Sequence, residues 1–424
     1  MRVIYINSLV VMIFMLINPL YALAFTAVIS VITEKVNNLI IATLYVLSFS
    51  LLFANQAIDN VSDLGAYVDM YQRTEGRTIL SIFNSFIESP HAKEALWLYF
   101  CMAIGGISSY NPEFYIFSTY MLIFGLSAYL AFLYSENGIH NFCLILFSII
   151  FFNITLMELG YNLWRNIIAS IIFLIGVNKY FLIRSDLKSR VISRIIIYSS
   201  FLVHIAVLPM IALFEIYAFF SSERNKYLLV TKKSIAKYFL FIFLSIFGIF
   251  FLSNSIYKFV INDPSHFLYR AFSVYVGFAH EFSFKNYLSP LYVMLGGSIV
   301  VNWKRLTNSD FFILAVAIIF EILLMTNIEM NMIFARASIA TQIGIIFISI
   351  KIFQQFNYKY SVAFICLIFV WRMRMLINNM DISGSHLFIK EVGQGEIFNH
   401  AYGLLLSTMH FYNPIFIGYF FSPI

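Results

Sequence analysis

The sequence predicts an all-α protein that is embedded in a membrane. Of its 424 residues, 61% are hydrophobic and only 11% are charged, and the mean hydropathy is +0.84. A water-soluble protein of this size has no core large enough to hide so much apolar surface. In lipid the backbone polar groups must be satisfied within the protein, and the chain lacks the alternating ten-residue pattern of a membrane barrel. Helices are therefore expected throughout.

The apolar runs predict a polytopic protein with about 10–13 helices, including re-entrant or interfacial segments. The runs that are long enough to cross about 30 Å of hydrocarbon lie at 9–32, 39–57, 114–134, 142–157, 164–183, 238–256, 287–301, 311–327, 337–353 and 360–377. The first run resembles a signal peptide but continues to Ile32, which favours an uncleaved helix. No repeat or linker divides the chain, so we expect one integral membrane domain spanning 1–424.

The charges predict the topology. Two loops are rich in lysine and arginine and should be cytoplasmic, namely the loop with Arg184, Lys188, Arg190 and Arg194 and the loop with Arg224, Lys226, Lys232, Lys233 and Lys237. The apolar stretch 195–220 between them is long for one crossing and short for two. We therefore expect it to enter the membrane and return, with His204 and Pro209 near its extracytoplasmic apex. The same reasoning places 58–113, 257–286 and 378–400 outside the cytoplasm.

For three segments the sequence is compatible with more than one arrangement in the membrane. The short stretch at 94–109 is predicted to be an interfacial or re-entrant helix, because a full crossing would turn the acidic loop before it cytoplasmic. The sequence leaves open whether 94–109, 191–220 and 401–421 are complete spans.

The polar residues near predicted helix ends indicate a binding site. Arg165, His204, Arg270 and Arg336 each fall at or near an extracytoplasmic end, and Glu94 opens the interfacial helix. An ionisable side chain near hydrocarbon costs at least ~2 kcal/mol, so such residues are usually kept for a partner, a cavity or a substrate. Several arginines facing one region suit an anionic ligand such as a phosphate or diphosphate. The alternative is structural: arginines at helix ends reach lipid headgroups, and a single histidine packs as a hydrogen-bonding residue.

Neither a metal nor a cofactor is expected. Cys101, Cys143 and Cys366 lack CxxC spacing, and the histidines lack ligand spacing. The nucleotide-binding and hydrolase motifs are absent as well, so neither nucleotide chemistry nor a nucleic-acid partner is expected. Aromatic residues such as Trp97, Tyr99 and Tyr110 are either interfacial packing or a surface on which sugars stack.

Several short motifs resemble a known family. They are YVDMYQ with Asp69 and Tyr71, E-x-x-W-x-Y from Glu94 through Trp97, W-R-N-x-x-A from Trp164, F-L-V-H ending at His204, and F-A-R-A-S around Arg336. Their order over residues 60–220 resembles the EpsG-like and Wzy-type polysaccharide polymerases. The chain departs from the usual pattern at Asn166, where the family has glutamine, and at Ile205, where proline is common.

The resemblance implies a metal-independent glycosyltransferase of the bacterial inner membrane, with its active site facing the periplasm. Such an enzyme transfers a growing O-antigen or capsule-like glycan from undecaprenyl diphosphate to the non-reducing end of a lipid-linked repeat unit. The expected partners are these lipid-linked oligosaccharides, membrane lipids and a co-polymerase that sets chain length.

The resemblance also assigns roles to residues. Arg165 and Arg336, with Arg270 as a weaker candidate, would hold the departing diphosphate. His204 or Glu94 would act on the acceptor hydroxyl, and the position of His204 at the helix break favours it. His204 could equally hydrogen-bond the diphosphate. Asp69 and Tyr71 would bind sugar hydroxyls in an outer loop, beside Trp97. The alternatives from other classes are a flippase or transporter for lipid-linked oligosaccharides and an O-antigen ligase.

Overall fold

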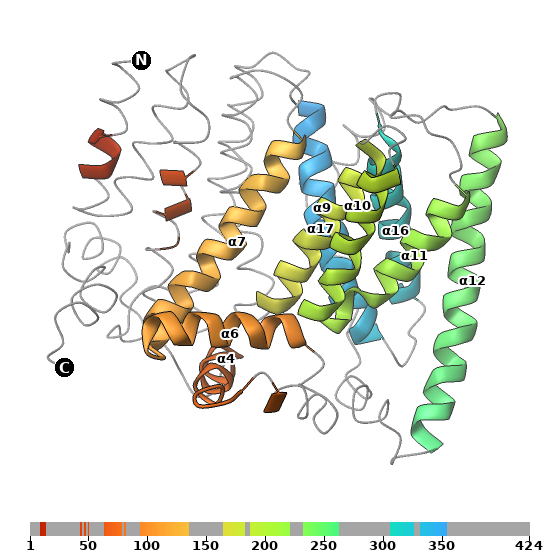
Figure 1. Cartoon of the computed structure of the whole chain (residues 1–424). Helices are drawn as coiled ribbons and strands as arrows, with labels where there is room; N and C mark the ends of the chain where they lie inside the picture. Colours follow the sequence, from red (N-terminus) through yellow and green to blue (C-terminus); the bar gives the residue numbers. More distant parts are fainter. Residues whose placement is uncertain are drawn as a thin grey trace, which may run out of the picture. The chain divides into compact units, whose positions relative to one another are not determined.

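The computed structural model describes residues 9–13, 43–44, 46–47, 50, 63–78, 80–81, 94–134, 164–182, 187–220, 232–262, 306–325 and 331–353 (Figure 1). Within these residues 92% are helical and none forms a strand, which confirms the predicted all-α class. The contacts divide the chain into two compact units. Unit 1 comprises 1–77, 98–164 and 353–424, and unit 2 comprises 78–97 and 165–352. The expectation of a single integral domain stays a prediction.

Unit 1 is built on aromatic packing around α4 (Asp63–Gln72). The ring of Tyr71 stacks on Tyr115 at 4.2 Å, and its hydroxyl forms a 2.7 Å hydrogen bond with that of Ser108. One turn earlier, Tyr67 stacks on Trp164 at 5.3 Å. The YVDMYQ segment, which is predicted to lie outside the cytoplasm, is helical, and its side of the membrane stays a prediction. The four-residue spacing of its two tyrosines places both rings on one helix face, where they are buried.

A tight corner joins α6 (Ala95–Ser108) to α7 (Pro112–Tyr134). The residues between them, Ser109 and Tyr110, adopt left-handed φ angles of 49° and 60°. Gly105 makes room for the returning Tyr110 ring, because a Cβ there would lie 2.4 Å from it. The Asn111 side chain accepts a 2.8 Å hydrogen bond from the Phe114 amide, which caps α7. At 14 residues, or about 21 Å, α6 is too short to cross a bilayer, as expected of an interfacial helix.

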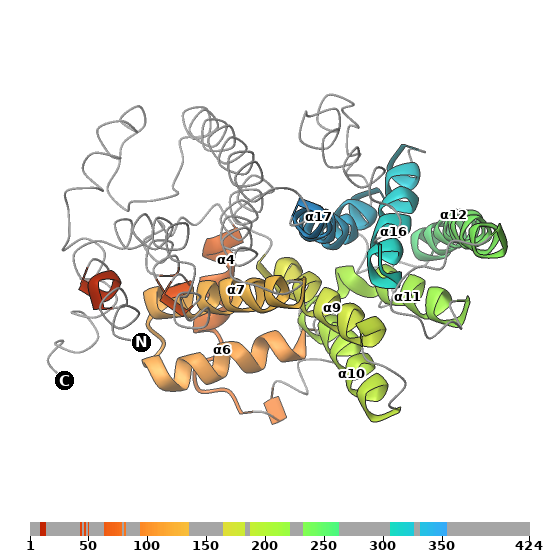
Figure 2. The same cartoon turned by 90° about the horizontal axis from the view of Figure 1, so that it is seen from above.

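Unit 2 contains a bundle of helices: α9 (Trp164–Leu182, from Arg165 onward), α10 (Leu187–Val203), α11 (Leu208–Phe220), α12 (Lys232–Asn262), α16 (Asn308–Met325) and α17 (Asn331–Phe353, up to Ile352). Seen from above, α16 lies between α17 and α12 (Figure 2). Glycines permit two close approaches. A Cβ on Gly176 of α9 would lie 2.6 Å from Ile197 of α10, and one on Gly344 of α17 would lie 2.6 Å from Ile313 of α16.

The chain reverses direction at His204. Helix α10 ends at Val203, a short 3-10 turn covers Ile205–Val207, and α11 begins at Leu208. Arg194 of α10 forms a 2.9 Å ion pair with Glu215 of α11. These two residues lie at similar distances along the chain on either side of His204, so the two helices form a hairpin. The predicted break and return are confirmed, and their depth in a membrane stays a prediction. Helix α10 begins at Leu187, before the predicted apolar stretch 195–220, so the basic residues ahead of that stretch belong to the same helix.

The described helices agree with five of the predicted runs. Helices α7, α9, α16 and α17 occupy the runs at 114–134, 164–183, 311–327 and 337–353, and α12 extends beyond 238–256 at both ends. Among the described residues, α7 is the one helix found to be both long and apolar enough to cross a bilayer. A core helix of a soluble protein meets the same test, so the polytopic arrangement remains a prediction. The runs at 142–157, 287–301, 360–377 and 401–421, and most of 9–32 and 39–57, lie outside the described residues.

Candidate functional site

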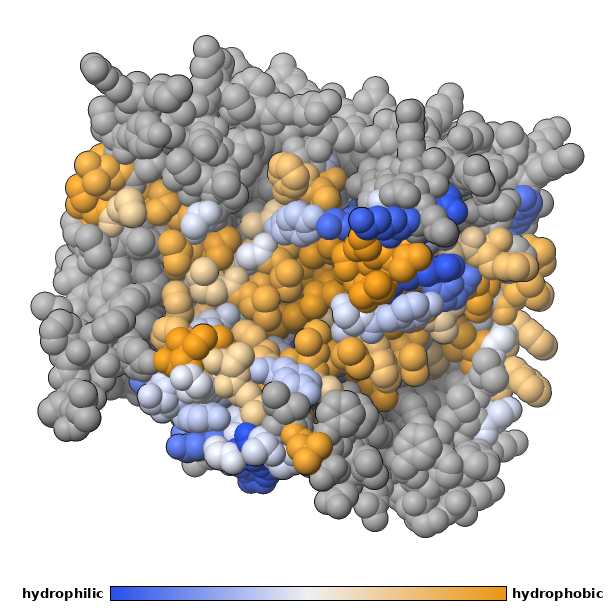
Figure 3. All heavy atoms as spheres, viewed as in Figure 1, coloured by the Kyte–Doolittle hydropathy of each residue, from blue (hydrophilic) through white to orange (hydrophobic). Residues whose placement is uncertain are grey.

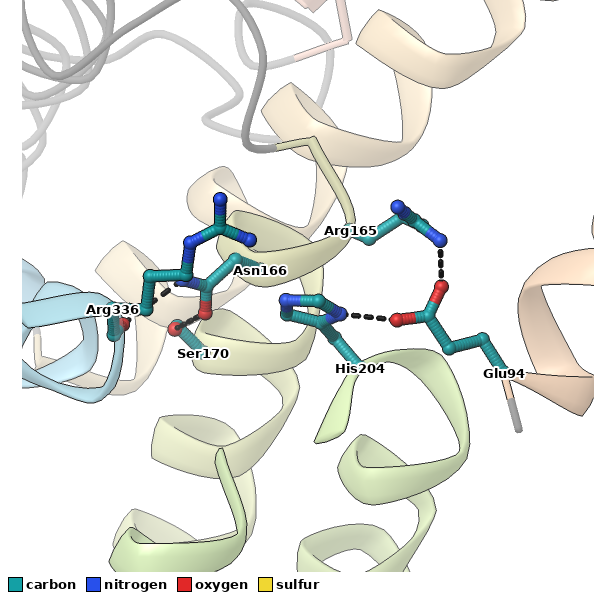
Figure 4. Close-up of polar contacts among 6 residues, drawn as sticks. All are labelled: Glu94, Arg165, Asn166, Ser170, His204 and Arg336. Atoms are coloured by element: carbon teal, nitrogen blue, oxygen red, sulfur yellow. Dashed lines mark hydrogen bonds and ion pairs between the residues drawn. The ribbon is translucent and has the colours of Figure 1, made fainter. Parts of the chain in front are cut away.

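The carboxylate of Glu94 joins two of the predicted site residues within unit 2 (Figure 4). Its Oε2 accepts a hydrogen bond and an ion pair from Nη1 of Arg165. Its Oε1 is hydrogen-bonded to Nδ1 of His204. The three residues come from different places: the residue before α6, the first turn of α9 and the break after α10. All three side chains are largely buried.

The local structure explains how each side chain reaches the cluster. Arg165 is the second residue of α9, so it projects from the positively polarised end of that helix. His204 has an extended backbone conformation, with φ −157° and ψ 132°, and its amide still donates to the Ser200 carbonyl at 3.1 Å. This break releases the imidazole from the helical side-chain direction. Pro209 favours the break, because it fits only the first turn of the following helix.

Glu94 is held in its ionised form. Burial alone would raise the pKa of its carboxyl group, but the neighbouring His204 and then Arg165 more than offset this and lower the pKa below its ordinary value. The carboxylate is therefore negative at neutral pH.

The geometry distinguishes the roles of Glu94 and His204. Both carboxylate oxygens are engaged, so Glu94 is poorly placed to take a proton from a substrate hydroxyl. His204 is bound through Nδ1, and a carboxylate on that atom fixes the ring orientation and favours the tautomer with a basic Nε2. The sequence favoured His204 as the base, with Glu94 as the alternative, and left open a role of His204 in binding the diphosphate. The contacts favour His204 for proton transfer and Glu94 as the residue that positions it.

Asn166 links the second arginine to the cluster. Its side-chain Nδ2 donates a 2.9 Å hydrogen bond to the main-chain carbonyl of Arg336 on α17, and its Oδ1 accepts a longer 3.4 Å bond from the Ser170 hydroxyl. Asn166 is 1% exposed and follows Arg165 directly, so the first turn of α9 is tied to the turn of α17 that carries Arg336. The only sequence signal for Asn166 is an amide side chain followed four residues later by a serine within an apolar segment.

The remaining predicted residues are placed elsewhere. In unit 1, Asp69 lies on the exposed face of α4 and pairs with Arg73 at 2.8 Å, while Tyr71 is fully buried. Trp97 is also buried, in the first turn of α6. The rings of Tyr71 and Trp97 are buried, and the role in binding sugars expected of these residues stays a prediction. Arg270 lies outside the described residues.

Within the described ranges, no group of three or more histidine, cysteine, aspartate or glutamate residues could hold a metal ion.

Comparisons of the chain with known protein families, with curated proteins and with solved structures find no significant match. The family resemblance of the motifs stays a prediction.

Proposed function

We propose that this protein is a polytopic glycosyltransferase of the bacterial inner membrane that polymerises a surface polysaccharide. Its donor is a growing glycan on undecaprenyl diphosphate, and its acceptor is the non-reducing end of a lipid-linked repeat unit at the periplasmic face. The observation that carries the proposal is the cluster in which buried Glu94 holds His204 through one oxygen and Arg165 through the other. Such a cluster combines a positioned base with a fixed cation.

The proposed reaction is a displacement at the anomeric carbon of the donor. Nε2 of His204 takes the proton of the acceptor hydroxyl while the hydroxyl oxygen forms the new glycosidic bond. The bond between the anomeric carbon and the diphosphate oxygen breaks, and the electron pair leaves with undecaprenyl diphosphate. Negative charge then grows on the leaving group. Arg165 and Arg336 stabilise this charge as preorganised cations.

The charge balance of the site suits an anionic leaving group. Glu94 is negative, and Arg165 and Arg336 are positive, so the three residues carry a net positive charge with a neutral His204. A guanidinium presents five N–H donors in a planar fork, which lets Arg165 contact Glu94 through Nη1 and an anion through other donors. The Asn166 bond supports the same interpretation, because it holds the backbone of Arg336 next to α9.

The test is complementation of a deletion strain, with surface polysaccharide separated on gels. Wild type should restore a ladder of chain lengths. His204→Ala and Arg165→Ala should leave single capped repeat units at normal membrane levels of protein. Arg73→Ala, which removes an exposed arginine of unit 1, is the matched control and should give a normal ladder.

Other outcomes point to other functions. Loss of all capped units in the deletion strain indicates a ligase, and repeat units stranded on the cytoplasmic side indicate a flippase. A normal ladder in both well-expressed site variants would show that the cluster is not the active site. A normal ladder in the deletion strain itself would remove the polymerase proposal.

A further inference from the structure

A second group of cations lies in unit 2 at the start of α10, away from the reversal at His204. The guanidinium carbons of Arg190 and Arg194 lie 5.8 Å and 5.6 Å from the centre of the Tyr180 ring, near the end of α9. Both distances are within the range of cation–π interactions, which hold a guanidinium plane in a defined place. Two flexible cations are thus ordered around one aromatic ring.

This group has more positive than negative charge. Arg194 is balanced by Glu215, which also accepts a 2.8 Å hydrogen bond from Tyr198. Across the described part of the chain, no carboxylate lies within ion-pair distance of Arg190. The first turn of α10 contains no acidic residue, although the positive end of a helix favours one. An anion bound at Arg190 would therefore offset charge that the described residues leave unbalanced.

Apolar side chains lie directly beside these cations. Val191, Ile192 and Ile195 follow Arg190 on α10 and are 50%, 45% and 60% exposed. Figure 3 shows hydrophilic side chains over the upper part of α10 and α11, next to a strongly hydrophobic patch. A soluble anion would leave this patch uncovered. A ligand with a phosphate group and hydrocarbon chains matches both parts of the surface.

We propose that Arg190, Arg194 and Tyr180 form a binding site for the headgroup of an anionic phospholipid, whose acyl chains lie on Val191 and Ile195. The basic start of α10 falls on the predicted cytoplasmic side, where anionic lipids give the membrane surface a negative potential. The guanidiniums, already ordered by the Tyr180 ring, donate to the phosphate oxygens. The site lies at the start of α10 and does not depend on the proposed glycosyl transfer.

The experiment is a lipid titration of the purified full-length protein in a neutral detergent. Phosphatidylglycerol and phosphatidylcholine with the same acyl chains are added separately, and the unfolding temperature is followed with lipid concentration. Native mass spectrometry counts the bound lipids. Sodium glycerol 3-phosphate and inorganic phosphate are added in parallel to separate lipid binding from anion binding.

Phosphatidylglycerol should raise the unfolding temperature of wild type more than phosphatidylcholine does, and the soluble phosphates should have no such effect. Arg190→Gln should shift the midpoint of the phosphatidylglycerol titration to about fivefold higher concentration, as expected for the loss of one cation at a lipid surface. Arg73→Gln removes the same charge from an exposed position of α4 and should titrate like wild type.

The proposal is overturned if Arg190→Gln titrates like wild type, if phosphatidylcholine acts as strongly as phosphatidylglycerol, or if the soluble phosphates reproduce the effect. Should Arg190→Gln fail to give a cooperative unfolding transition, Ile195→Ser provides the second test. Its side chain is mostly exposed, so folding should be retained while phosphatidylglycerol binds more weakly. Unchanged binding in that variant would equally overturn the proposal.

Discussion

The pair of Arg165 with Glu94 and the pair of Arg73 with Asp69 join the same two kinds of group in different surroundings. The side chains of the first pair are 18% and 7% exposed, and those of the second are 71% and 58% exposed. The first pair connects residues 71 positions apart, whereas the second spans one turn of α4. Water screens the attraction within the exposed pair and hydrates each of its charges when the other is absent. The charges of the buried pair lack such hydration.

This difference suggests what each pair is for. Burying an ion pair removes two charges from water, and the Coulomb attraction repays that cost only when further hydrogen bonds are made. Glu94 has such a bond, to His204. Apolar replacement of a buried ion pair is often neutral or stabilising, so stability alone gives little reason to keep the cluster. The exposed pair on α4 needs no explanation beyond the solubility of that face.

Glu94→Ala should have the largest effect on stability. It leaves the guanidinium of Arg165 and the ring of His204 buried without their carboxylate, and breaking a buried pair in this way costs about 3–5 kcal/mol. The free energy of unfolding in detergent, from denaturant titration, measures the loss. A loss below about 1 kcal/mol would mean that water or another group replaces the carboxylate, and the contrast with α4 would disappear.

Glu94→Gln should change the dependence of stability on pH. Because the pKa of Glu94 in the folded protein is below its ordinary value of 4.5, the stabilisation from its ionised form is fully present above that pH and is lost as the pH falls through the lowered pKa. The difference in unfolding free energy between wild type and Glu94→Gln should be largest near neutral pH and shrink below pH 4.5. A difference that grows on acidification would contradict the ionised state of Glu94.

Asn166→Ala should have an intermediate effect. It removes the 2.9 Å hydrogen bond to the partly buried carbonyl of Arg336, which costs about 0.5–1.5 kcal/mol in unfolding free energy. In the complementation assay it should also shorten the polysaccharide ladder, because Arg336 loses its attachment to α9. Ser170→Ala is the matched control, since it removes only the longer 3.4 Å bond to the same amide. Equal effects of the two variants would show that the link to Arg336 is unimportant.

Arg73→Ala should have the smallest effect. Pairs exposed to solvent four residues apart on a helix contribute at most about 0.5 kcal/mol. The unfolding free energy should therefore stay within that value of wild type, and added salt should reduce the difference further. A larger loss of unfolding free energy would mean that burial does not explain the difference in stability between the two ion pairs.

The sequence predicts the members of the cluster better than their contacts. Arg165 and His204 stand out because ionisable groups are rare in apolar segments, and Glu94 because it opens a short helix. Which oxygen of Glu94 contacts Arg165 and which contacts His204 depends on residues 71 and 110 positions away, and no local pattern encodes such a pairing. The reversal at His204 was predictable because the apolar stretch 195–220 separates two basic loops that are expected on the same side of the membrane. The chain must therefore turn back within that stretch.

The helix around Tyr71 has a physical cause that composition alone does not reveal. Aspartate and glutamate residues around α4 give the segment the composition of a loop, while the spacing of Tyr67 and Tyr71 is that of a buried helix face. Composition and spacing conflicted, and burial against Tyr115 decided in favour of the helix. The polar link from Asn166 to Arg336 was missed because its acceptor is a main-chain carbonyl, which every residue has.

Glu94 precedes both Arg165 and His204 in the sequence, so the ribosome makes it before either partner. A ribosome adds about 5–20 residues per second, so the codon for His204 is translated about 5–20 s after that for Glu94. During this interval the nascent carboxylate has neither partner beside it and must stay hydrated or protonated. The three residues can meet only after α9 and the α10–α11 hairpin have been made. A nascent chain that stops short of the hairpin would expose an unmatched acidic group, by which quality-control proteases could distinguish it from the finished protein.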